Sequence, residues 1–227
     1  NPSNPATTAT PPASMSFSRP APPPAPPPVH LALLGPGQVG MALLRQLSAE
    51  APRLREAGRA ELRVVALANS RQMVLADPVE SPVARAQALV SGDEPGIPLE
   101  LEVVAEQLAA AADRRGGIPV LVDATASEVP VEHYARWLAA GIHVVTPNKR
   151  GGAGPLVRRQ ALAQAAREGG SQWRYEATVG AGLPVIVSLQ DLLATGDVLL
   201  GVEGVLSGSL AWLLHALEEG MPGEEAL

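Results

Sequence analysis

Hydrophobic and polar positions alternate in blocks along this chain, and the blocks have two different periods. Short apolar runs rich in valine and leucine, which are typical of buried strands, occupy 29–34, 61–68, 118–124 and 142–145. The segments between them predict helices from 41 to about 50, at 83–90, at 101–112 and at 131–140, with a polar connection at 52–60 and an otherwise irregular 77–98. Strands separated by helices imply a parallel sheet covered on both faces. We therefore predict an α/β fold, a Rossmann-type doubly wound parallel sheet, for residues 29–150.

The pattern changes after residue 150. Gly151–Gly154 is a break, after which helices are predicted at 156–168, 183–194 and 210–219 and strands at 173–178 and 198–206. This mixed order predicts part of an α+β substrate and dimerisation domain over residues 151–227. It is too short for an independent domain, so we expect it to pack on the first domain or on another subunit. Because the sequence stops at Leu227 within a helical pattern, we expect the domain to be cut there.

Residues 1–28 differ in composition from the rest. They hold 11 of the 23 prolines and one charged residue, Arg19, and the stretch from Ala21 to Pro28 is typical of an extended polyproline helix. The stretch has neither an apolar signal core nor many arginines, which argues against a targeting peptide. We expect a disordered proline-rich leader or linker.

The strongest motif follows the first predicted strand. Gly35, Gly37 and Gly40 have the spacing GxGxxG between a buried strand and an amphipathic helix, which is the order of a dinucleotide-binding turn. Gly35 permits the turn, Gly37 lets the backbone approach phosphate, and Gly40 lets helix and strand pack closely. The free amides at the helix start favour an anion. The predicted cofactor contacts here are Gly35, Pro36, Gly37, Gln38, Val39 and Gly40; the alternative is a merely structural glycine turn.

The end of the second predicted strand bears on the choice of cofactor. An acidic residue there would bind the ribose 2′-hydroxyl of NAD, but the chain has Asn69, Ser70 and Arg71 and no acid before Asp77. These residues favour NADP, with NAD as the alternative. Arg71 could also be an ordinary solvated cation.

Two further candidates follow strands at the carboxyl edge of the sheet. Thr125 lies just after the 118–124 strand, where it could meet the ribose or nicotinamide; the alternative is a helix cap built on Ser127 and Pro130. Lys149 follows the 142–145 strand and is the only lysine beside sixteen arginines. A lysine at this edge can donate to a carbonyl oxygen, shuttle a proton or contact the cofactor, so we predict that it is catalytic rather than a surface cation.

The run from Tyr175 to Pro184 is also unusual. It places a carboxylate, Glu176, before the glycine-rich turn of Gly180 and Gly182. Exposed carbonyls and one carboxylate suit a hard cation or a polar substrate. Taken alone, the run is also compatible with a simple strand-to-helix turn.

Composition narrows the function classes. The net charge of −6 argues against nucleic acid, and no apolar run reaches the roughly 18 residues of a membrane helix. The chain has no cysteine, which excludes disulfides, thiolate zinc sites and cysteine nucleophiles and favours a cytoplasmic location. The histidines at 30, 133, 143 and 215 show no spacing typical of metal ligands.

From about Val29 to its end, the chain resembles homoserine dehydrogenase. The resemblance rests on four motifs in order: GPGQVG, VVTPNK, YEATVGAGLPVI and EGVLSGSL. The details ALANS and LEEGMPGEEA are most similar to the dehydrogenase part of bifunctional aspartokinase–homoserine dehydrogenases. The resemblance implies NAD(P)-dependent interconversion of L-aspartate 4-semialdehyde and L-homoserine, a small-molecule substrate of threonine and methionine biosynthesis. It also implies a homo-oligomer, a dimer or larger, and a fused aspartokinase in a longer protein.

Carried over by position, the resemblance implies cofactor contacts at the glycine turn, Thr125 and Lys149, and a reactive role for Lys149. It further implies a sodium site formed by Glu176 and by the carbonyls of Val179, Ala181 and Leu183. One departure is important: the family's acid/base segment, similar to TEPDPRDDLxGxDxxRK, has no counterpart here. We therefore expect this chain alone to be nearly inactive. The alternatives are a non-catalytic NADP-binding module and another Rossmann oxidoreductase of amino-acid metabolism; aspartate-semialdehyde dehydrogenase is disfavoured because it needs a cysteine.

Overall fold

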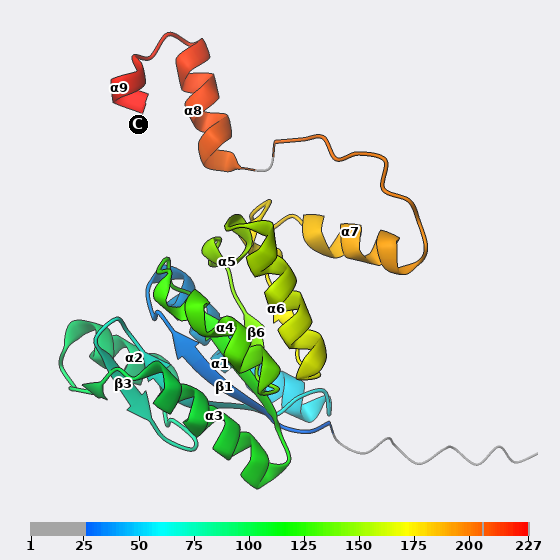
Figure 1. Cartoon of the computed structure of the whole chain (residues 1–227). Coiled ribbons are helices and arrows are strands. Elements are labelled where there is room, and N and C mark those ends of the chain that lie inside the picture. Colours follow the sequence, from blue (N-terminus) through cyan, green and yellow to red (C-terminus); the bar gives the residue numbers. More distant parts are fainter. Residues whose placement is uncertain (1–25, 206, 227) are drawn as a thin grey trace, which may run out of the picture.

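The computed structural model describes residues 26–205 and 207–226 and contains a seven-stranded sheet in the order β4-β3-β2-β1-β5-β6-β7 (Figure 1). Its strands are β1 (Val29–Leu34), β2 (Leu62–Ala68), β3 (Gln72–Leu75), β4 (Ile97–Pro98), β5 (Ile118–Asp123), β6 (His143–Val145) and β7 (Trp173–Arg174). β1 pairs in parallel with β2 on one side and β5 on the other. The predicted leader lies outside the described residues, except for 26–28.

Five neighbouring strands of the sheet are parallel, as predicted: β2, β1, β5, β6 and β7. β3 and β4 are antiparallel, and both were missed by the sequence pattern. The cause is a local turn: the side-chain oxygen of Asn69 accepts hydrogen bonds from the amides of Arg71 and Gln72, each at 2.8 Å. This side-chain turn reverses the chain directly after β2 and pairs β3 with it.

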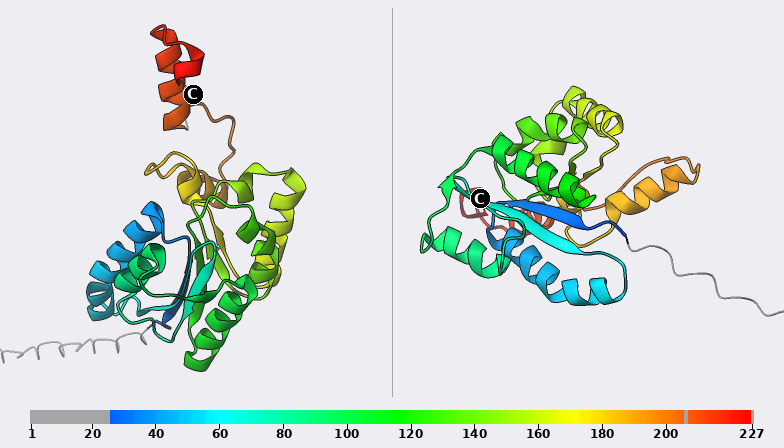
Figure 2. Two further views of the ribbon diagram at one scale, coloured as in Figure 1. Left: turned by 90° about the vertical axis from the view of Figure 1, so that its left-hand side faces the viewer. Right: turned by 90° about the horizontal axis from the view of Figure 1, so that it is seen from below.

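Helices cover both faces of the sheet (Figure 2). Those from the first half are α1 (Gln38–Glu56), α2 (Pro82–Ser91), α3 (Leu101–Arg115) and α4 (Val129–Ala139). Leu31 and Leu33 of β1 share a core cluster with α1 and α2, whereas Ala32 and Leu34 belong to the cluster that includes α3, α4 and α6 (Leu156–Glu168). This alternation of side chains along one strand buries both faces, so the prediction of a doubly wound sheet is confirmed.

Helix α1 is longer than its pattern indicates. The predicted end at about Glu50 is wrong, because the helix passes through Pro52 and ends at Glu56. Of the polar connection predicted at 52–60, only 57–60 lies outside a helix or strand. Pro52 is exposed, so water can satisfy the carbonyl that loses its helical donor.

The second half extends the same layers and then leaves them. α6 packs on α4, and β7 pairs with β6. The predicted break at Gly151–Gly154 is mostly a short helix, α5 (Arg150–Ala153), and the predicted strand at 173–178 stops after two residues and becomes a 3-10 turn, Glu176–Thr178. Because β7 is an edge strand with only two paired positions, its sequence is not held extended further.

The remaining elements project from the sheet (Figure 1). They are α7 (Val185–Ala194), α8 (Gly208–Glu218) and α9 (Gly223–Ala226). The predicted strand at 198–206 is wrong for the described residues 198–205, which are exposed and have no regular structure. No described strand lies beside this segment to complete a ladder, although its valines and leucines have high β-propensity. Leu206 lies outside the described residues.

Candidate functional site

The glycine turn joins β1 to α1 in the predicted way. Gly35 has φ +82°, and a Cβ atom there would lie 2.8 Å from the Thr125 methyl carbon. A Cβ atom on Gly40 would overlap the carbonyl oxygen of Gly35. Nothing lies within 4 Å of the Cβ position of Gly37. Steric demands of the fold thus explain two of the three glycines, and the third faces open space.

The start of α1 offers unpaired donors. The first helical hydrogen bond of α1 is donated by the amide of Met41 to the carbonyl of Gly37, at 2.8 Å. The amides of Gln38, Val39 and Gly40 precede it, and no acidic side chain lies in the first turn. A helix start of this kind attracts an anion.

A pocket of about 460 Å³ opens where the carboxyl ends of β1, β2 and β5 meet. Its lining includes Gly35, Asn69, Ser70 and Thr125, which are four of the predicted cofactor residues. β1 is the strand at which the order of the sheet reverses, and ligands of open α/β sheets bind at this switch point. The structure therefore brings these four residues into one crevice.

Arg71 lies in a neighbouring hollow of about 510 Å³, which it shares with Asn69, Gln72 and Gly96. The Asn69 side chain is committed to the turn into β3 and to the Leu89 carbonyl, at 3.0 Å. Arg71 is exposed and makes no ion pair within residues 26–205 and 207–226. Of the three residues after β2, Arg71 is the charged one, and no described carboxylate neutralises its guanidinium group.

A buried hydrogen-bond network links the ends of β5 and β6. The Asp123 carboxylate accepts hydrogen bonds from the Thr125 amide (2.8 Å), the Tyr134 hydroxyl (2.5 Å) and the Asn148 side-chain amide (3.0 Å). The Thr146 hydroxyl donates to the Asp123 carbonyl at 2.7 Å. Burial and the adjacent carboxylate raise the pKa of Tyr134 well above its usual range, so the hydroxyl stays protonated and donates.

Sequence reasoning did not identify this network. Tyr134, Thr146 and Asn148 lie 11 to 25 residues from Asp123 in the chain, so spacing does not connect them to it. The available signals were the aspartate that ends a buried strand and the asparagine before Lys149.

The Ser127 side chain, considered as an alternative helix cap, does bond at the start of α4, although the capping residue there is Glu128. The Ser127 hydroxyl accepts from the Val129 amide at 3.2 Å, and the Thr125 hydroxyl accepts from the Ser127 amide at 3.2 Å. Thr125 thus shapes the loop and also lines the crevice.

Lys149 lies apart from Thr125. It lines a different pocket, of about 300 Å³, together with Arg159, Trp173, Tyr175 and Val179. The two pockets share no lining residue. The loops that carry Lys149 and Thr125 are nevertheless tied together, because the Asn148 side chain donates to the carbonyl of Ser127 at 2.8 Å.

The turn predicted to hold a cation starts beside Lys149. Val179 lines the Lys149 pocket, and the next two residues, Gly180 and Ala181, have φ of +75° and +51°. Glu176 is occupied by an ion pair with Arg174 at 3.1 Å. Leu183 is exposed. Among the described residues, no three histidine, cysteine, aspartate or glutamate side chains gather as metal ligands would.

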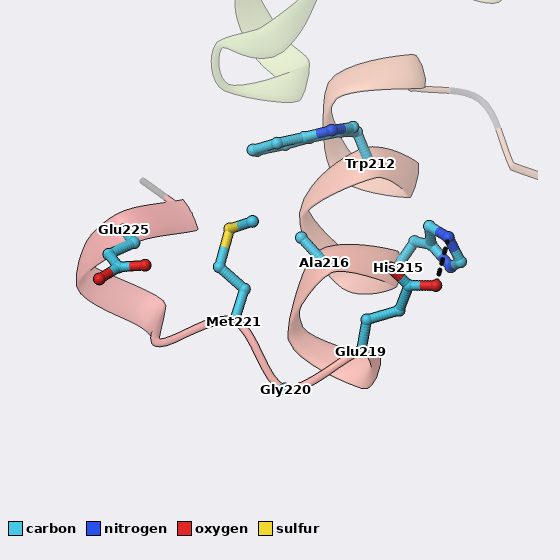
Figure 3. A pocket seen from close by; sticks show the side chains of 7 residues that line it. All are labelled: Trp212, His215, Ala216, Glu219, Gly220, Met221 and Glu225. Atoms are coloured by element: carbon cyan, nitrogen blue, oxygen red, sulfur yellow. Dashed lines mark ion pairs between the residues drawn. The ribbon is translucent and has the colours of Figure 1, made fainter.

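A further hollow of about 390 Å³ lies between α8 and α9, where Trp212 and Met221 face each other and His215 lies 3.5 Å from Glu219 (Figure 3). It includes none of the predicted site residues. Within the described part of the chain, no helix is both long and apolar enough to cross a membrane.

Comparisons with known proteins agree with this geometry. A family model described as "Homoserine dehydrogenase, NAD binding domain" matches residues 35–176. The bifunctional aspartokinase/homoserine dehydrogenase 1, chloroplastic, of Zea mays is 39% identical over 190 residues, which are 83% of this chain and 20% of the relative. The homoserine dehydrogenase of Emericella nidulans is 35% identical over 192 residues, 83% of this chain and 50% of the relative. The chain thus spans about a fifth to a half of the length of these relatives.

Solved structures show the same fold. A homoserine dehydrogenase from Thiobacillus denitrificans matches with a TM-score of 0.61 and 26% identity, over 88% of this chain and 41% of that one. A hyperthermophilic archaeal homoserine dehydrogenase in complex with NADPH matches with a TM-score of 0.64 and 23% identity, over 87% of this chain and 59% of that one. The family model covers more than half of the sequence, so the chain belongs to the homoserine dehydrogenase family.

Proposed function

We propose that this chain is the cofactor-binding part of a homoserine dehydrogenase, which reduces L-aspartate 4-semialdehyde with NADPH and a proton to give L-homoserine and NADP, reversibly. The observation that carries the proposal is the crevice at the switch point, which Gly35, Asn69, Ser70 and Thr125 line together. The family membership supplies the reaction. The pathway that follows from it is threonine and methionine biosynthesis.

The residues of the glycine turn fit a pyrophosphate. The Gln38, Val39 and Gly40 amides form a partly positive helix start, and the open space at Gly37 leaves room for phosphate oxygens. Arg71, exposed and without an ion pair in the described ranges, supports a preference for NADP, because a guanidinium can bind the 2′-phosphate. Thr125 lines the same crevice, which supports a contact with the ribose or nicotinamide.

When bound, NADPH supplies the hydride that the aldehyde carbon accepts. Lys149 then acts on the aldehyde oxygen, where negative charge develops. Its ammonium group can stabilise that oxygen and donate the proton that completes the alcohol. Lys149 is exposed and makes no ion pair with a described carboxylate, so its charge is available for this role.

We also propose that Glu176 and the carbonyls of Val179, Ala181 and Leu183 hold Na⁺ or a similar monovalent cation. The support is the turn itself, because Ala181 is a non-glycine residue with a left-handed conformation, and such conformations gather at functional sites. Glu176 would have to exchange its partner Arg174 for the cation.

The partners and location are likewise proposals. We propose a homo-oligomer, a dimer or larger, because α8 exposes Leu210, Trp212 and Leu214 by more than half of their surface. A fused aspartokinase is proposed from the bifunctional relatives. The cysteine-free sequence supports the cytoplasm, while the Zea mays relative is named chloroplastic.

The test is to measure NADPH binding and the oxidation of NADPH by L-aspartate 4-semialdehyde, both with this chain and with any longer product of its open reading frame. Turnover supports the proposed enzyme. If NADPH binds but neither product turns over, the result favours the non-catalytic NADP-binding module. Absence of NADPH binding by both products contradicts the proposal.

A further inference from the structure

The side chain of Asn148 makes three hydrogen bonds where the two candidate loops meet. It is 3% exposed, and each of its side-chain hydrogen-bonding groups has a partner. Its Nδ2 group donates to Asp123 Oδ2 at 3.0 Å and to the Ser127 carbonyl at 2.8 Å. Its Oδ1 atom accepts from the amide of Arg150 at 3.1 Å. One planar amide therefore joins the end of β5, the loop after it and the loop after β6.

These bonds hold the residues directly before and after Lys149. The residue before it is fixed by the bonds of Asn148, whose own amide also donates to the Thr146 hydroxyl at 2.8 Å. The residue after it, Arg150, is held by Asn148 Oδ1 and by a bond from its Nε to the Ala126 carbonyl at 2.7 Å. The backbone of Lys149 thus cannot shift relative to residues 126 and 127 without breaking several of these bonds.

The other end of the network reaches the cofactor crevice. Asp123 Oδ1 accepts from the amide of Thr125, which lines that crevice. Asp123 Oδ2 accepts from Asn148. The same carboxylate therefore fixes the loop of Thr125 and the loop of Lys149, although the two side chains lie in different pockets.

We propose that Asn148 is a positioning residue, which acts with Asp123 to set where Lys149 lies relative to the crevice of Thr125. The catalytic meaning of this position rests on the proposed function. The chemistry requires an amide at residue 148, because only asparagine offers two donors and one acceptor at this reach. An aspartate at 148 would place a second carboxylate against Asp123, and an alanine would leave Asp123 Oδ2 and the Ser127 carbonyl short of a donor.

The first experiment reads the position of Lys149 without cofactor or substrate. Lys149 is the only lysine of the chain, so reductive methylation with ¹³C-formaldehyde labels it and the N-terminus alone. Its pocket is also lined by Trp173 and Tyr175, so we expect their ring currents to displace the methyl resonance from that of free dimethyl-lysine. We expect Asn148→Ala to move this resonance toward the free value.

The matched control is Ser171→Ala. It removes one partly buried hydrogen bond, which the Ser171 hydroxyl donates to the Leu138 carbonyl at 2.7 Å and which is remote from both loops. We expect this variant to keep the wild-type resonance. Identical Lys149 resonances in wild type, Asn148→Ala and Ser171→Ala would overturn the proposal. If Asn148→Ala does not fold, Asn148→Ser, which keeps one donor, takes its place with the same expected direction.

The second experiment measures steady-state kinetics in whichever product of the gene turns over. We expect Asn148→Ala to lower kcat about a hundredfold, the usual effect of moving a reacting group by about 1 Å, and to change the Kd for NADPH less than about twofold. Ser171→Ala should change neither value. A kcat that falls only with the fraction of folded protein would contradict positioning. A wild type without NADPH binding would sink the proposed function, whereas the resonance of Lys149 would still decide the role of Asn148.

Discussion

A methyl group on Gly40 would overlap the carbonyl oxygen of Gly35, so α1 can approach the end of β1 only because residue 40 has no side chain. Gly37, between them, has no neighbour near its Cβ position and a φ of −80°, which any residue can adopt. The fold therefore needs Gly40, whereas only a ligand would need Gly37.

Two alanine variants separate these roles. We expect Gly40→Ala to destabilise the fold by about 1–3 kcal/mol, as overpacking does, and to weaken NADPH binding through displacement of the turn. Gly37→Ala should change the free energy of unfolding by less than about 0.5 kcal/mol but raise the Kd for NADPH about tenfold or more, because the methyl group occupies the space proposed for phosphate. Thermal unfolding and fluorescence titration measure the two effects. Tight NADPH binding by a stable Gly37→Ala protein would contradict the proposed phosphate position.

The proposed role of Lys149 predicts a loss of turnover without a loss of cofactor. We expect Lys149→Ala to lower kcat about 10²- to 10⁴-fold, as removal of a proton donor does, while the Kd for NADPH changes less than about threefold. Lys149→Arg keeps the charge and should change the Kd for NADPH even less. Because Lys149 is exposed, the melting temperature should stay the same. Near wild-type turnover in Lys149→Ala would make this lysine a bystander.

Arg71 should determine the choice of cofactor. We expect Arg71→Ala to weaken NADPH binding about tenfold or more, since a guanidinium–phosphate pair contributes roughly 1.5–3 kcal/mol, and to leave NADH binding nearly unchanged. The effect should decrease with added salt. Arg59, also exposed and without an ion pair in the described ranges, is the matched control, and Arg59→Ala should alter neither cofactor. Equal losses for NADPH and NADH would contradict a 2′-phosphate contact.

The sequence alone predicts the parts of the fold that depend on local pattern. β1 runs from Val29 to Leu34 as expected, because its alternate side chains are buried on both faces. The crevice residues could be named because glycine spacing and strand ends are readable in order along the chain. β3 could not be predicted from hydrophobicity, since it depends on how the Asn69 side chain turns the backbone.

Long-range pairing explains the other differences. The valines and leucines of 198–205 suggest a strand, but a strand needs a neighbour, and the described structure provides none. The network of Asp123, Tyr134 and Asn148 depends on β5, α4 and the loop after β6 meeting in space, which spacing does not reveal. Lys149 could be chosen as a candidate from its rarity, but its separation from the Thr125 pocket could not be predicted.

His30 should make stability depend on pH. It lies on β1 with 0% exposure, and neither ring nitrogen has a hydrogen-bond partner among the described residues. Burial lowers its pKa below the usual 6.5, Asp77 opposes this change, and the cations Arg63 and Arg115 add to it. Because the unfolded chain then binds the proton more readily, the stabilisation is present above pH 6.5 and is lost as the pH falls toward the folded value.

We therefore expect the free energy of unfolding to decrease as the pH falls below about 6.5, with at most about 1.4 kcal/mol per pH unit from this one group. His30→Leu, which replaces the imidazole beside Gly117 with an apolar side chain of similar volume, should reduce that slope. Denaturant unfolding at a series of pH values measures it.

Burial also lowers the pKa of His143, so the His30→Leu variant should retain a part of the slope. The double variant His30→Leu,His143→Gln should remove most of it. The interval from pH 7.5 to 9 is the internal control, since neither histidine titrates there; an unchanged slope below pH 6.5 in His30→Leu would show that His30 does not bind the proton.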